Sequence, residues 1–518
     1  MKNMGKKRKK RNTKLYASRF IIVFLSIILQ ALVFWAFIFL VQKRFVLVSY
    51  ITTIIGVLLL ISIINKKQAA VYKLPWFFLY LIFPFGAVMI YLTFGNVKVS
   101  KKQMRKYRSV YSEKDEEYYE QDKVLARLDE TGGSGVGIAK YLKNATSLPV
   151  LDNSTCEYLH SGENFFARLL EEIGKAEKYV FLEYFIIEDG RMWAEIMEIL
   201  LEKVAKGVGV YVMYDDVGSM KSVSPNYHKK LQAEGIKAKK FHKFVPIVSV
   251  SHNNRDHRKI AVIDGKTGFV SGANLSDEYI NYTHPFGRWL DSAVMIRGQA
   301  VDSLVKLFIQ LYNMEGGEEL DGEKFIFKDH EKYSDGFIIS YGDSPAPIEE
   351  DHIGENVYLD IINRADKYVY ITTPYLICDT NITDALKTAV KRGVDVRIIV
   401  PSVPDKKFIY IMTRHTCSDL LSAGVKIYKY KDGFIHSKNI LSDGQTAVVG
   451  TINLDYRSFV HHYECGVLMY KSDAVNDLYE DFIRLFDEEC EVADKESLKL
   501  GFFEKIVKTV LTLFAPLM

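Results

Sequence analysis

The first hundred residues of the chain contain three apolar runs without charged residues, at 20–41, 45–64 and 74–97. Each of the first two is long enough to cross the roughly 30 Å hydrocarbon core of a bilayer as a helix. A secretory signal peptide has a shorter apolar core and a small-residue cleavage site after it, and the first run fits neither feature. The pattern therefore predicts a membrane hairpin near the start of the chain.

The third run, residues 74–97, is interrupted by Pro75, Pro84 and Gly86, so it either spans the membrane or re-enters it. Lysines and arginines cluster at residues 2–19 and 98–108, on both sides of the apolar runs. This bias favours a cytoplasmic soluble part, although a long domain can override it. We expect a multi-pass membrane protein, and the side on which its soluble part lies stays open.

Beyond the apolar runs, residues 98–150 are highly charged and then rich in glycine, which predicts a solvated connector. Strand and helix patterns alternate after it. Residues 179–187 and 208–216 form apolar runs typical of buried strands, and residues 190–206 between them have helical periodicity. This βαβ order predicts an α/β fold.

The second half of the chain repeats this order, which indicates an internal duplication. Similar segments follow in the same order in both halves: residues 176–186, 205–214 and 231–241 correspond to residues 365–377, 391–400 and 420–430, respectively. The stretch at 340–350, SYGDSPAPIEE, is typical of a linker. We therefore expect two similar domains, at residues 151–345 and 346–497.

The last segment, residues 498–518, is expected to form an amphipathic helix with Lys505 and Lys508 on its polar side. It either packs on the protein core or lies in the lipid interface.

Composition narrows the class of protein. A chain of 518 residues has room for two or three domains, and its net charge of +4 is too small to indicate a nucleic-acid partner. The basic clusters flank apolar runs, so we expect them to contact anionic lipids. The five cysteines show no CxxC pair and no zinc-ligand spacing, so neither a disulfide framework nor a metal site is expected.

The strongest chemical signal is a motif that occurs twice. Each copy holds a histidine, a lysine, an aspartate and an asparagine at the same spacing: His257, Lys259, Asp264 and Asn274 in the first, and His436, Lys438, Asp443 and Asn453 in the second. A single match of this kind is weak evidence, but two matches inside a wider repeat are strong evidence.

Strand geometry separates the members of the motif. Side chains two residues apart share a face of a strand, so His257 and Lys259 are expected to point the same way. Asp264 lies an odd number of residues from its histidine, as does Asp443, and on a straight strand both would face away. From spacing alone these aspartates are therefore interpreted as structural.

Two histidines, each beside a lysine, suit phosphoryl transfer through a covalent intermediate. One neutral imidazole attacks phosphorus, while the other, protonated, donates to the leaving oxygen. The lysines, with Asn274 and Asn453, would hold the phosphate oxygens and stabilise charge in the transition state. Because no dense carboxylate cluster is present, we expect neither a metal nor another cofactor.

The repeated HxK motif followed by Asp resembles the phospholipase D superfamily over residues 150–518. Within that superfamily, DDVGS at 215–219, SGANLSDEY at 271–279, GTINLDYRSF at 450–459 and the terminal LFAPLM resemble bacterial cardiolipin synthases. The resemblance implies tandem phospholipase D-like domains behind N-terminal transmembrane helices. Each domain would be a mixed sheet flanked by helices, and a pseudo-two-fold axis would relate the two, with the active site at their interface.

The same resemblance implies a function. A phosphatidyl group would pass from one phosphatidylglycerol through phosphohistidine to a second, giving cardiolipin and glycerol. The family counts His257, Lys259, Asp264 and their counterparts as the catalytic set, and its usual order makes His257 the nucleophile. It also implies a carboxylate downstream of each histidine that holds the ring, and Asp291 and Glu464 lie at the corresponding places.

Several alternatives stay open. A phospholipase D-type hydrolase or another phosphatidyltransferase would share these catalytic residues and differ in the acceptor. A nuclease is disfavoured by the apolar runs, and a non-enzymatic membrane scaffold is disfavoured by two intact motifs. The expected partners are phosphatidylglycerol and anionic lipids of the bacterial cell membrane, without nucleic acid, and the oligomeric state stays open.

Two weaker signals complete the picture. Asp215 and Asp216 end a predicted strand and are candidates for a supporting role at the site. His461 and His462 are adjacent, so on a strand they would face opposite ways, and no shared role is expected of them.

Overall fold

The computed structural model describes residues 28, 29, 32, 36, 46–66, 70–94, 99–110, 114–243, 253–346, 348, 351–431 and 433–515. Most of the first apolar run therefore lies outside the described residues. The chain divides into two compact units. The first comprises Met1–Lys98 with Lys243–Asn254 and Leu513–Met518, and the second comprises Val99–His242 and Arg255–Thr512.

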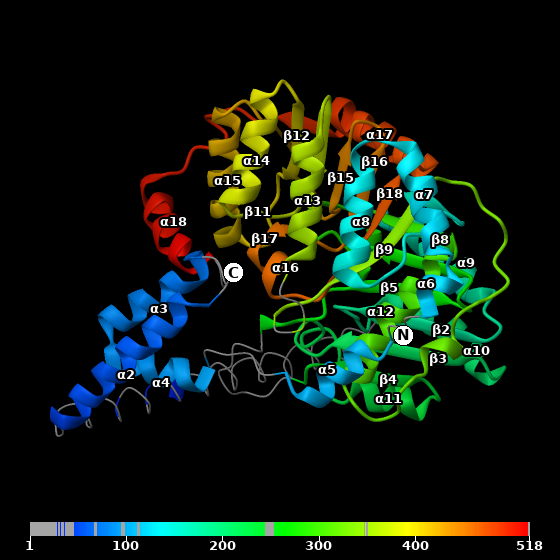
Figure 1. Cartoon of the computed structure of the whole chain (residues 1–518), viewed down its shortest axis with the longest axis horizontal. Coiled ribbons are helices and arrows are strands. Elements are labelled where there is room, and N and C mark those ends of the chain that lie inside the picture. The colour runs from blue at the N-terminus through cyan, green and yellow to red at the C-terminus, as the bar shows by residue number, and fades with distance from the viewer. Residues whose placement is uncertain are drawn as a thin grey trace, which may run out of the picture. The chain divides into compact units, whose positions relative to one another are not determined.

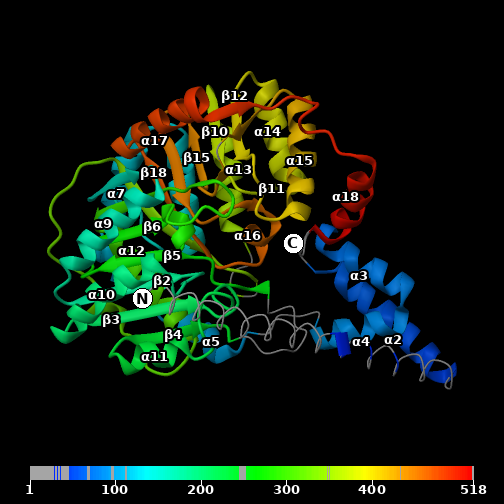
Figure 2. The same cartoon turned by 180° about the vertical axis from the view of Figure 1, so that it is seen from behind.

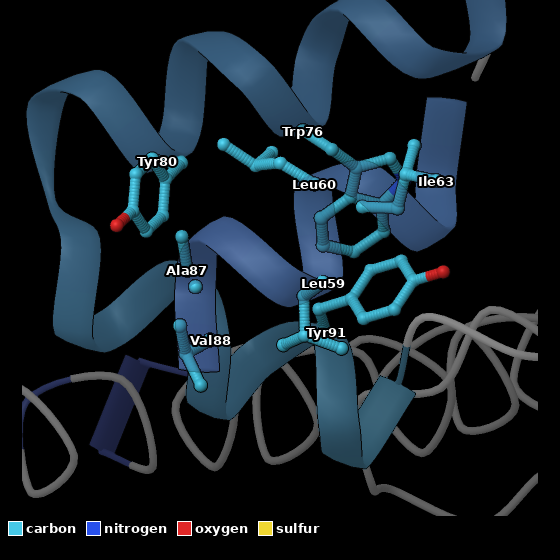
Figure 3. A pocket seen from close by; sticks show the side chains of 9 residues that line it. Leu59, Leu60, Ile63, Trp76, Tyr80, Ala87, Val88 and Tyr91 are labelled. Atoms are coloured by element: carbon cyan, nitrogen blue, oxygen red, sulfur yellow. The ribbon is translucent and has the colours of Figure 1, made fainter. Parts of the chain in front are cut away.

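In the described part of the first unit, three helices pack together: α2 (Val46–Ile64), α3 (Ala70–Ile82) and α4 (Pro84–Phe94). A shallow hollow between them is lined by apolar side chains (Figure 3). Trp76 and Tyr91 meet there edge to face, with ring centroids 4.9 Å apart. Helices α3 and α4 break at Phe83, so the third apolar run is not one continuous helix.

No helix in the described part of the chain combines the length and the hydropathy needed to cross a membrane. Helix α2 nevertheless occupies most of the second apolar run. The absence of a side chain at Gly56 lets it receive Tyr80, because a Cβ there would lie 2.1 Å from Tyr80 Cε2. The Tyr80 hydroxyl also donates to the Thr53 carbonyl oxygen, 3.2 Å away.

In the second unit, the first sheet has the strand order β1-β8-β6-β5-β2-β3-β4. These strands are β1 (Ser154–Leu159), β2 (Tyr179–Tyr184), β3 (Gly209–Asp215), β4 (Lys237–Phe241), β5 (Lys259–Ile263), β6 (Thr267–Ser271) and β8 (Ala293–Gly298). Strands β2, β3 and β4 are parallel, whereas β5, β6, β8 and β1 pair antiparallel, so the sheet is mixed. The predicted strands at 179–187 and 208–216 are confirmed.

Helices cover both faces of this sheet (Figures 1 and 2). On one face lie α9 (Gly162–Gly174) and α10 (Arg191–Ala205), the second of which confirms the helix predicted at 190–206. Their apolar sides pack on alternate residues of β2 and β3, because strand side chains alternate between faces. On the other face lies α12 (Ala300–Met314). The short α11 (Tyr227–Ala233) precedes β4.

The second sheet has the order β19-β13-β12-β10-β15-β16-β18-β9, which repeats the first and adds β19. Its strands are β9 (Phe337–Asp343), β10 (Tyr368–Thr372), β12 (Asp395–Pro401), β13 (Lys426–Tyr430), β15 (Asn439–Ser442), β16 (Thr446–Gly450), β18 (Glu464–Tyr470) and β19 (Cys490–Val492). Helices α13 (Ile353–Arg364), α14 (Thr380–Lys391) and α15 (Lys407–Ser422) cover one face, and α17 (Asp473–Arg484) covers the other. The short elements β11 (Leu376–Ile377), β17 (Leu454–Asp455) and α16 (Tyr456–Val460) complete this half.

The boundary predicted after residue 345 is wrong by one strand. Strand β9 overlaps the stretch at 340–350 interpreted as a linker, since its last four residues fall there, yet it pairs with β18 in the second sheet. It is the counterpart of β1, so the second half begins at Phe337. Its turn-forming residues, such as Gly342 and Asp343, stand at the end of a strand rather than in a linker.

The two halves share one apolar core. Helix α12 packs on β9 of the other half, and α17 packs on β1, so the exchange is reciprocal. Leu304 and Phe308 of α12 and Leu478 and Phe482 of α17 belong to the same cluster. All residues of α12 are buried, which is the pattern of a helix enclosed between two layers.

The prediction of a solvated connector at 98–150 is also wrong. This stretch forms α5 (Lys101–Arg108), α6 (Lys114–Tyr118), α7 (Gln121–Thr131) and α8 (Ser134–Thr146). Leu128, Ile138 and Leu142 are fully buried in the core of the second half. Tyr119 donates to Asp302 of α12 at 3.0 Å, so the segment also contacts the first half.

Candidate active site

Two short backbone pairings bring the halves together at the histidines. Strand β7 (Arg288–Leu290) of the first half pairs with β14 (Gly433–Ile435) of the second, just before His436. Asp256, just before His257, forms the equivalent bridge with Tyr463.

The hydrogen bonds made by the two histidine backbones are reciprocal. The His257 N–H donates to the Tyr463 carbonyl oxygen at 2.9 Å, and the His436 N–H donates to the Leu290 carbonyl oxygen at 2.7 Å. Each acceptor residue is followed directly by an acid, Glu464 or Asp291.

Each histidine is consequently held by an acid from the other half. His257 Nδ1 lies 2.9 Å from both carboxylate oxygens of Glu464, and His436 Nδ1 lies 2.7 Å from Asp291 Oδ2. The order of the motif pairs each acid with the histidine upstream of it, and the structure exchanges those partners. A carboxylate that accepts at Nδ1 fixes the proton there and leaves the Nε2 lone pair free to react.

The two motif lysines lie beside these rings. Lys259 Nζ donates to the His257 carbonyl oxygen at 2.7 Å, and Lys438 Nζ lies 2.7 Å from His436 Nδ1. Burial lowers the pKa of Lys259 to about 8 and that of Lys438 to about 7. Near neutral pH both lysines can still carry the positive charge that a phosphodiester requires.

Burial also keeps both imidazoles neutral. It lowers the pKa of His436 to about 4 and that of His257 well below the usual value, and the nearby lysines add to both shifts. The acids respond differently. Burial opposes the ionisation of Asp291, but Lys438 and His436 together hold its pKa below the usual value. In contrast, burial raises the pKa of Glu464 well above its usual value.

Asp264 and Asp443, which the family motif counts as catalytic, do not reach the histidines. Asp264 accepts the backbone N–H groups of residues 177, 178 and 179, at 2.7 to 2.8 Å. Asp443 does the same with residues 366, 367 and 368, at 2.8 to 2.9 Å. The catalytic assignment of these two aspartates is corrected to a structural one, in agreement with strand geometry.

The two motif asparagines differ in how they are used. Asn274 is fully engaged, since its Oδ1 accepts the Ile186 N–H at 3.0 Å and its Nδ2 donates to the Tyr279 hydroxyl at 2.7 Å. Asn453 is buried, and its Oδ1 has no hydrogen-bond partner among the described residues.

A glycine and a threonine occupy matching positions beside the two acids. A Cβ at Gly272 would lie 2.0 Å from Asp291 Oδ1, so the absence of a side chain makes room for that carboxylate. At the matching position Thr451 donates its hydroxyl to Glu464 Oε2. Both positions therefore control where an acid lies.

Sequence reasoning missed several groups at the site. Aromatic rings flank the histidines, with Phe185 at 5.2 Å from His257 and Tyr279 and Trp289 each at 5.3 Å from His436, between ring centroids. His462 also lies here, 5.2 Å from the His257 ring. It stands two residues before Glu464, and that spacing was the signal that could have placed both on one face.

Of the two weaker candidates, Asp215 supports the segment that leads to His257. Its carboxylate accepts from Arg255 Nε at 2.8 Å and from the Asp256 N–H at 3.1 Å. Asp216 pairs with Lys240 at 2.9 Å instead.

Comparison with known proteins agrees with this geometry. The family model described as "Cardiolipin synthase, PLD-like domain" matches residues 169–311 and 358–486, one stretch in each half. A crystal structure of phosphatidylserine synthase from Haemophilus influenzae has the same fold, with a TM-score of 0.56 at 17% identity, over 73% of this chain and 97% of that one. Fold and matched domains define a protein with two phospholipase D-like domains.

The sequence relatives narrow this class. The chain is 32% identical to a cardiolipin synthase of Halalkalibacterium halodurans over 91% of this chain and 93% of the relative. It is 31% identical to cardiolipin synthase 2 of Bacillus anthracis over 86% of each. An uncharacterized protein of Streptococcus mutans is 39% identical over 88% of this chain and 98% of its own length. The chain belongs to the cardiolipin synthase family.

Proposed function

We propose that this protein is a cardiolipin synthase that transfers a phosphatidyl group from one phosphatidylglycerol to another through phosphohistidine. The observation that carries the proposal is the pair of buried imidazoles, each held at Nδ1 by an acid of the other half and each beside a lysine. Membership of the family supplies the substrate class.

In the first step, Nε2 of His257 attacks the phosphorus of phosphatidylglycerol. The bond from phosphorus to the departing glycerol oxygen breaks, and protonated His436 donates its proton to that oxygen. Lys259 and Lys438 stabilise the charge on the phosphate oxygens. Free glycerol and a phosphatidyl group on His257 result.

In the second step, His436 takes the proton from a glycerol hydroxyl of a second phosphatidylglycerol. That oxygen attacks phosphorus, the bond from phosphorus to His257 Nε2 breaks, and cardiolipin leaves. Each histidine returns to its starting state, so the cycle needs no other reactant.

The two acids support this division of roles. Asp291 has a lowered pKa and stays anionic, so it stabilises the imidazolium form of His436 that a general acid needs. Burial raises the pKa of Glu464, so its charged form is less favoured and it stabilises an imidazolium less than Asp291 does, which favours a neutral His257 and hence a nucleophile. The bound phosphodiester adds the negative charge that brings a proton to His436.

The reaction is tested with full-length protein and phosphatidylglycerol vesicles, with glycerol and lipid products measured together. We expect cardiolipin and glycerol in equal amounts, and neither product from His257→Ala or His436→Ala. Phosphatidic acid in place of cardiolipin would show that water is the acceptor and that the protein is a phospholipase. No product from any phospholipid would contradict the proposal.

The enzyme is further proposed to act at the bacterial cell membrane as a multi-pass protein with anionic lipids as its surroundings. The apolar runs of the sequence support this placement, and so does α18 (Phe502–Phe514). Its large apolar side chains are exposed, with Phe502 at 74% and Phe503 at 79%. At about 100° per residue these two, Ile506, Val510 and Leu513 fall within one sector of roughly 100°.

The polar side of α18 carries Lys505 and Lys508, whereas Glu504 is paired with Arg414 at 2.9 Å. An apolar face with lysines behind it that form no ion pair with any described residue favours the lipid interface over packing on the core. Tryptophan placed at Ile506 is expected to be quenched by phosphatidylglycerol with brominated acyl chains. Absence of quenching would show that this face packs on protein.

A further inference from the structure

His462 has a buried imidazole whose hydrogen-bonding capacity is unused within the described part of the chain. It is 8% exposed, and neither Nδ1 nor Nε2 has a hydrogen-bond partner among the described residues. Its Nδ1 lies 3.5 Å from Glu464 Oε1 without forming a hydrogen bond. Leaving a buried polar group unpaired is destabilising. The proposed phosphatidyl transfer gives it no role.

The surroundings of His462 identify a ligand. One ligand atom each from His257, His462 and Glu464 lies within 4.8 Å of the others, and all three side chains are buried. Two imidazoles and one carboxylate form a known three-ligand set for zinc, which leaves a fourth position open. Bond lengths of about 2.0 to 2.2 Å place tetrahedral ligand atoms roughly 3.4 Å apart, so small side-chain rotations would close the set.

We propose that His257, His462 and Glu464 bind Zn²⁺ and that the bound ion inhibits the enzyme. The inhibition rests on the proposed function, because it follows from the engagement of His257, whereas the binding does not. An ion at this position takes His257 Nδ1, the nitrogen that lies 2.9 Å from Glu464, together with that carboxylate. The neutral ring then carries its proton on Nε2, so the nitrogen that would attack phosphorus has no free lone pair. Water or a phosphate oxygen would complete the coordination.

The ligand types select the metal. Two nitrogen donors and one oxygen donor suit zinc and its neighbours, whereas Mg²⁺ and Ca²⁺ prefer sets of oxygen ligands. The Thr451 hydroxyl donates to Glu464 and so orients it, as outer groups do around metal ligands. His461, the adjacent histidine, is not part of the cluster and provides a matched control.

The charges around the cluster set the strength of binding. Lys259 and Lys438 act on His257, and Arg255 and Arg457 act on His462, all as positive charges. They oppose a dication, so we expect reversible inhibition and not a permanently resident ion. The site would therefore act as an inhibitory sensor of free zinc.

The test compares detergent-solubilised full-length wild type with His462→Asn and His461→Asn. Zinc binding is measured by competition with a chromogenic chelator, and cardiolipin formation is measured across the same zinc range, with Mg²⁺ as the ionic control. Wild type and His461→Asn should each bind one Zn²⁺ and lose activity when it binds. Removal of the ion with EDTA should restore the activity. His462→Asn should stay active, while its zinc affinity and its inhibition both weaken at least about tenfold.

Two results would overturn the proposal: no zinc bound by wild type, or equal affinity and inhibition in His462→Asn. If that variant does not fold, wild type with Co²⁺ gives an independent measurement, since imidazole-bound cobalt has a distinctive visible spectrum, and its absence would equally overturn the site. Zinc binding that depends on His462 in a protein that makes no cardiolipin would contradict the proposed function and leave the metal site standing.

Discussion

His257 and His436 occupy equivalent positions in the two halves, yet the acids that hold them differ in length, charge and support. Asp291 is short, stays ionised and fits beside His436 because Gly272 has no side chain. Glu464 is one carbon longer, and burial raises its pKa. It accepts a hydrogen bond from the hydroxyl of Thr451, the residue that matches Gly272. A duplicated scaffold can thus hold two identical residues in different electrostatic states, which is what a nucleophile and a general acid need.

Removing each histidine in turn is expected to have the largest effect on the rate. We expect His257→Ala and His436→Ala each to lower the rate of cardiolipin formation by roughly 10⁴-fold or more, because nucleophile and general acid act as one unit. After reaction with a phosphatidyl p-nitrophenyl ester, whose leaving group needs no proton from His436, mass spectrometry of intact protein at neutral pH should find the phosphatidyl adduct only in His436→Ala. An adduct in His257→Ala instead would reverse the two roles.

Replacing each acid by its amide is expected to have the next largest effect on the rate of turnover. Asp291→Asn should slow turnover of phosphatidylglycerol by about 100-fold, since the imidazolium form of His436 loses its counter-charge. The loss of rate in Asp291→Asn should shrink to a few-fold with a phosphatidyl p-nitrophenyl ester, because p-nitrophenolate leaves without needing a proton. Glu464→Gln should lower both rates equally, and a leaving-group dependence there would contradict the assignment.

The pair formed by Gly272 and Thr451 tests how each acid is held. Gly272→Ala should displace Asp291 and reduce the rate by about tenfold to 100-fold, because its Cβ would lie 2.0 Å from the carboxylate. Thr451→Val removes one hydrogen bond to Glu464 and should cost about tenfold. Steady-state rates and melting temperatures of both variants would show whether the effect is on turnover or on folding.

The pH dependence of turnover distinguishes the two lysines. Lys438 has a pKa of about 7 and Lys259 of about 8, so rising pH removes the positive charge of Lys438 first. The ratio kcat/KM should therefore fall severalfold above pH 7. Lys438→Arg, whose guanidinium keeps its charge, should move this fall to higher pH, whereas Lys259→Arg should leave its onset near 7. An unchanged profile in Lys438→Arg would exclude that lysine as the titrating group.

The smallest effect on turnover is expected from the motif aspartates. Asp264→Asn and Asp443→Asn keep a residue that tolerates the positive φ of these positions, 55° and 54°, but weaken the bonds to three backbone N–H groups. Each should lower the free energy of unfolding by about 1 to 3 kcal/mol. The kcat of folded protein should change less than about twofold, and a large loss of kcat without a loss of stability would restore a catalytic role.

Local patterns predicted much of the fold. Strands such as β2 and β3 and helix α10 follow from apolar runs and helical periodicity, because each buries its own face. The helices between residues 101 and 146 were missed because charge and glycine outweighed apolar residues at helical spacing, such as Val124 and Leu128. Gly135 is not a sign of flexibility, since a Cβ there would lie 2.2 Å from the Tyr470 ring.

The site shows where sequence reasoning stops. The repeat identifies the histidines and lysines, and strand parity separates Asp264 and Asp443 from them. The exchange of acids between halves does not follow from spacing, because it depends on contacts between segments far apart in the chain, such as β7 with β14. His462 was set aside by comparing it with its neighbour, whereas its position relative to Glu464 was the informative one.

The exchange of acids also has a consequence for biosynthesis. On the ribosome, the first half emerges with His257 long before Glu464 is translated, and domains fold in order of emergence. An early-folded first half would hold its histidine without the acid that orients it. A nascent chain, or a fragment that ends before β18, would therefore lack an oriented nucleophile. It would not react with phospholipids until synthesis is nearly complete.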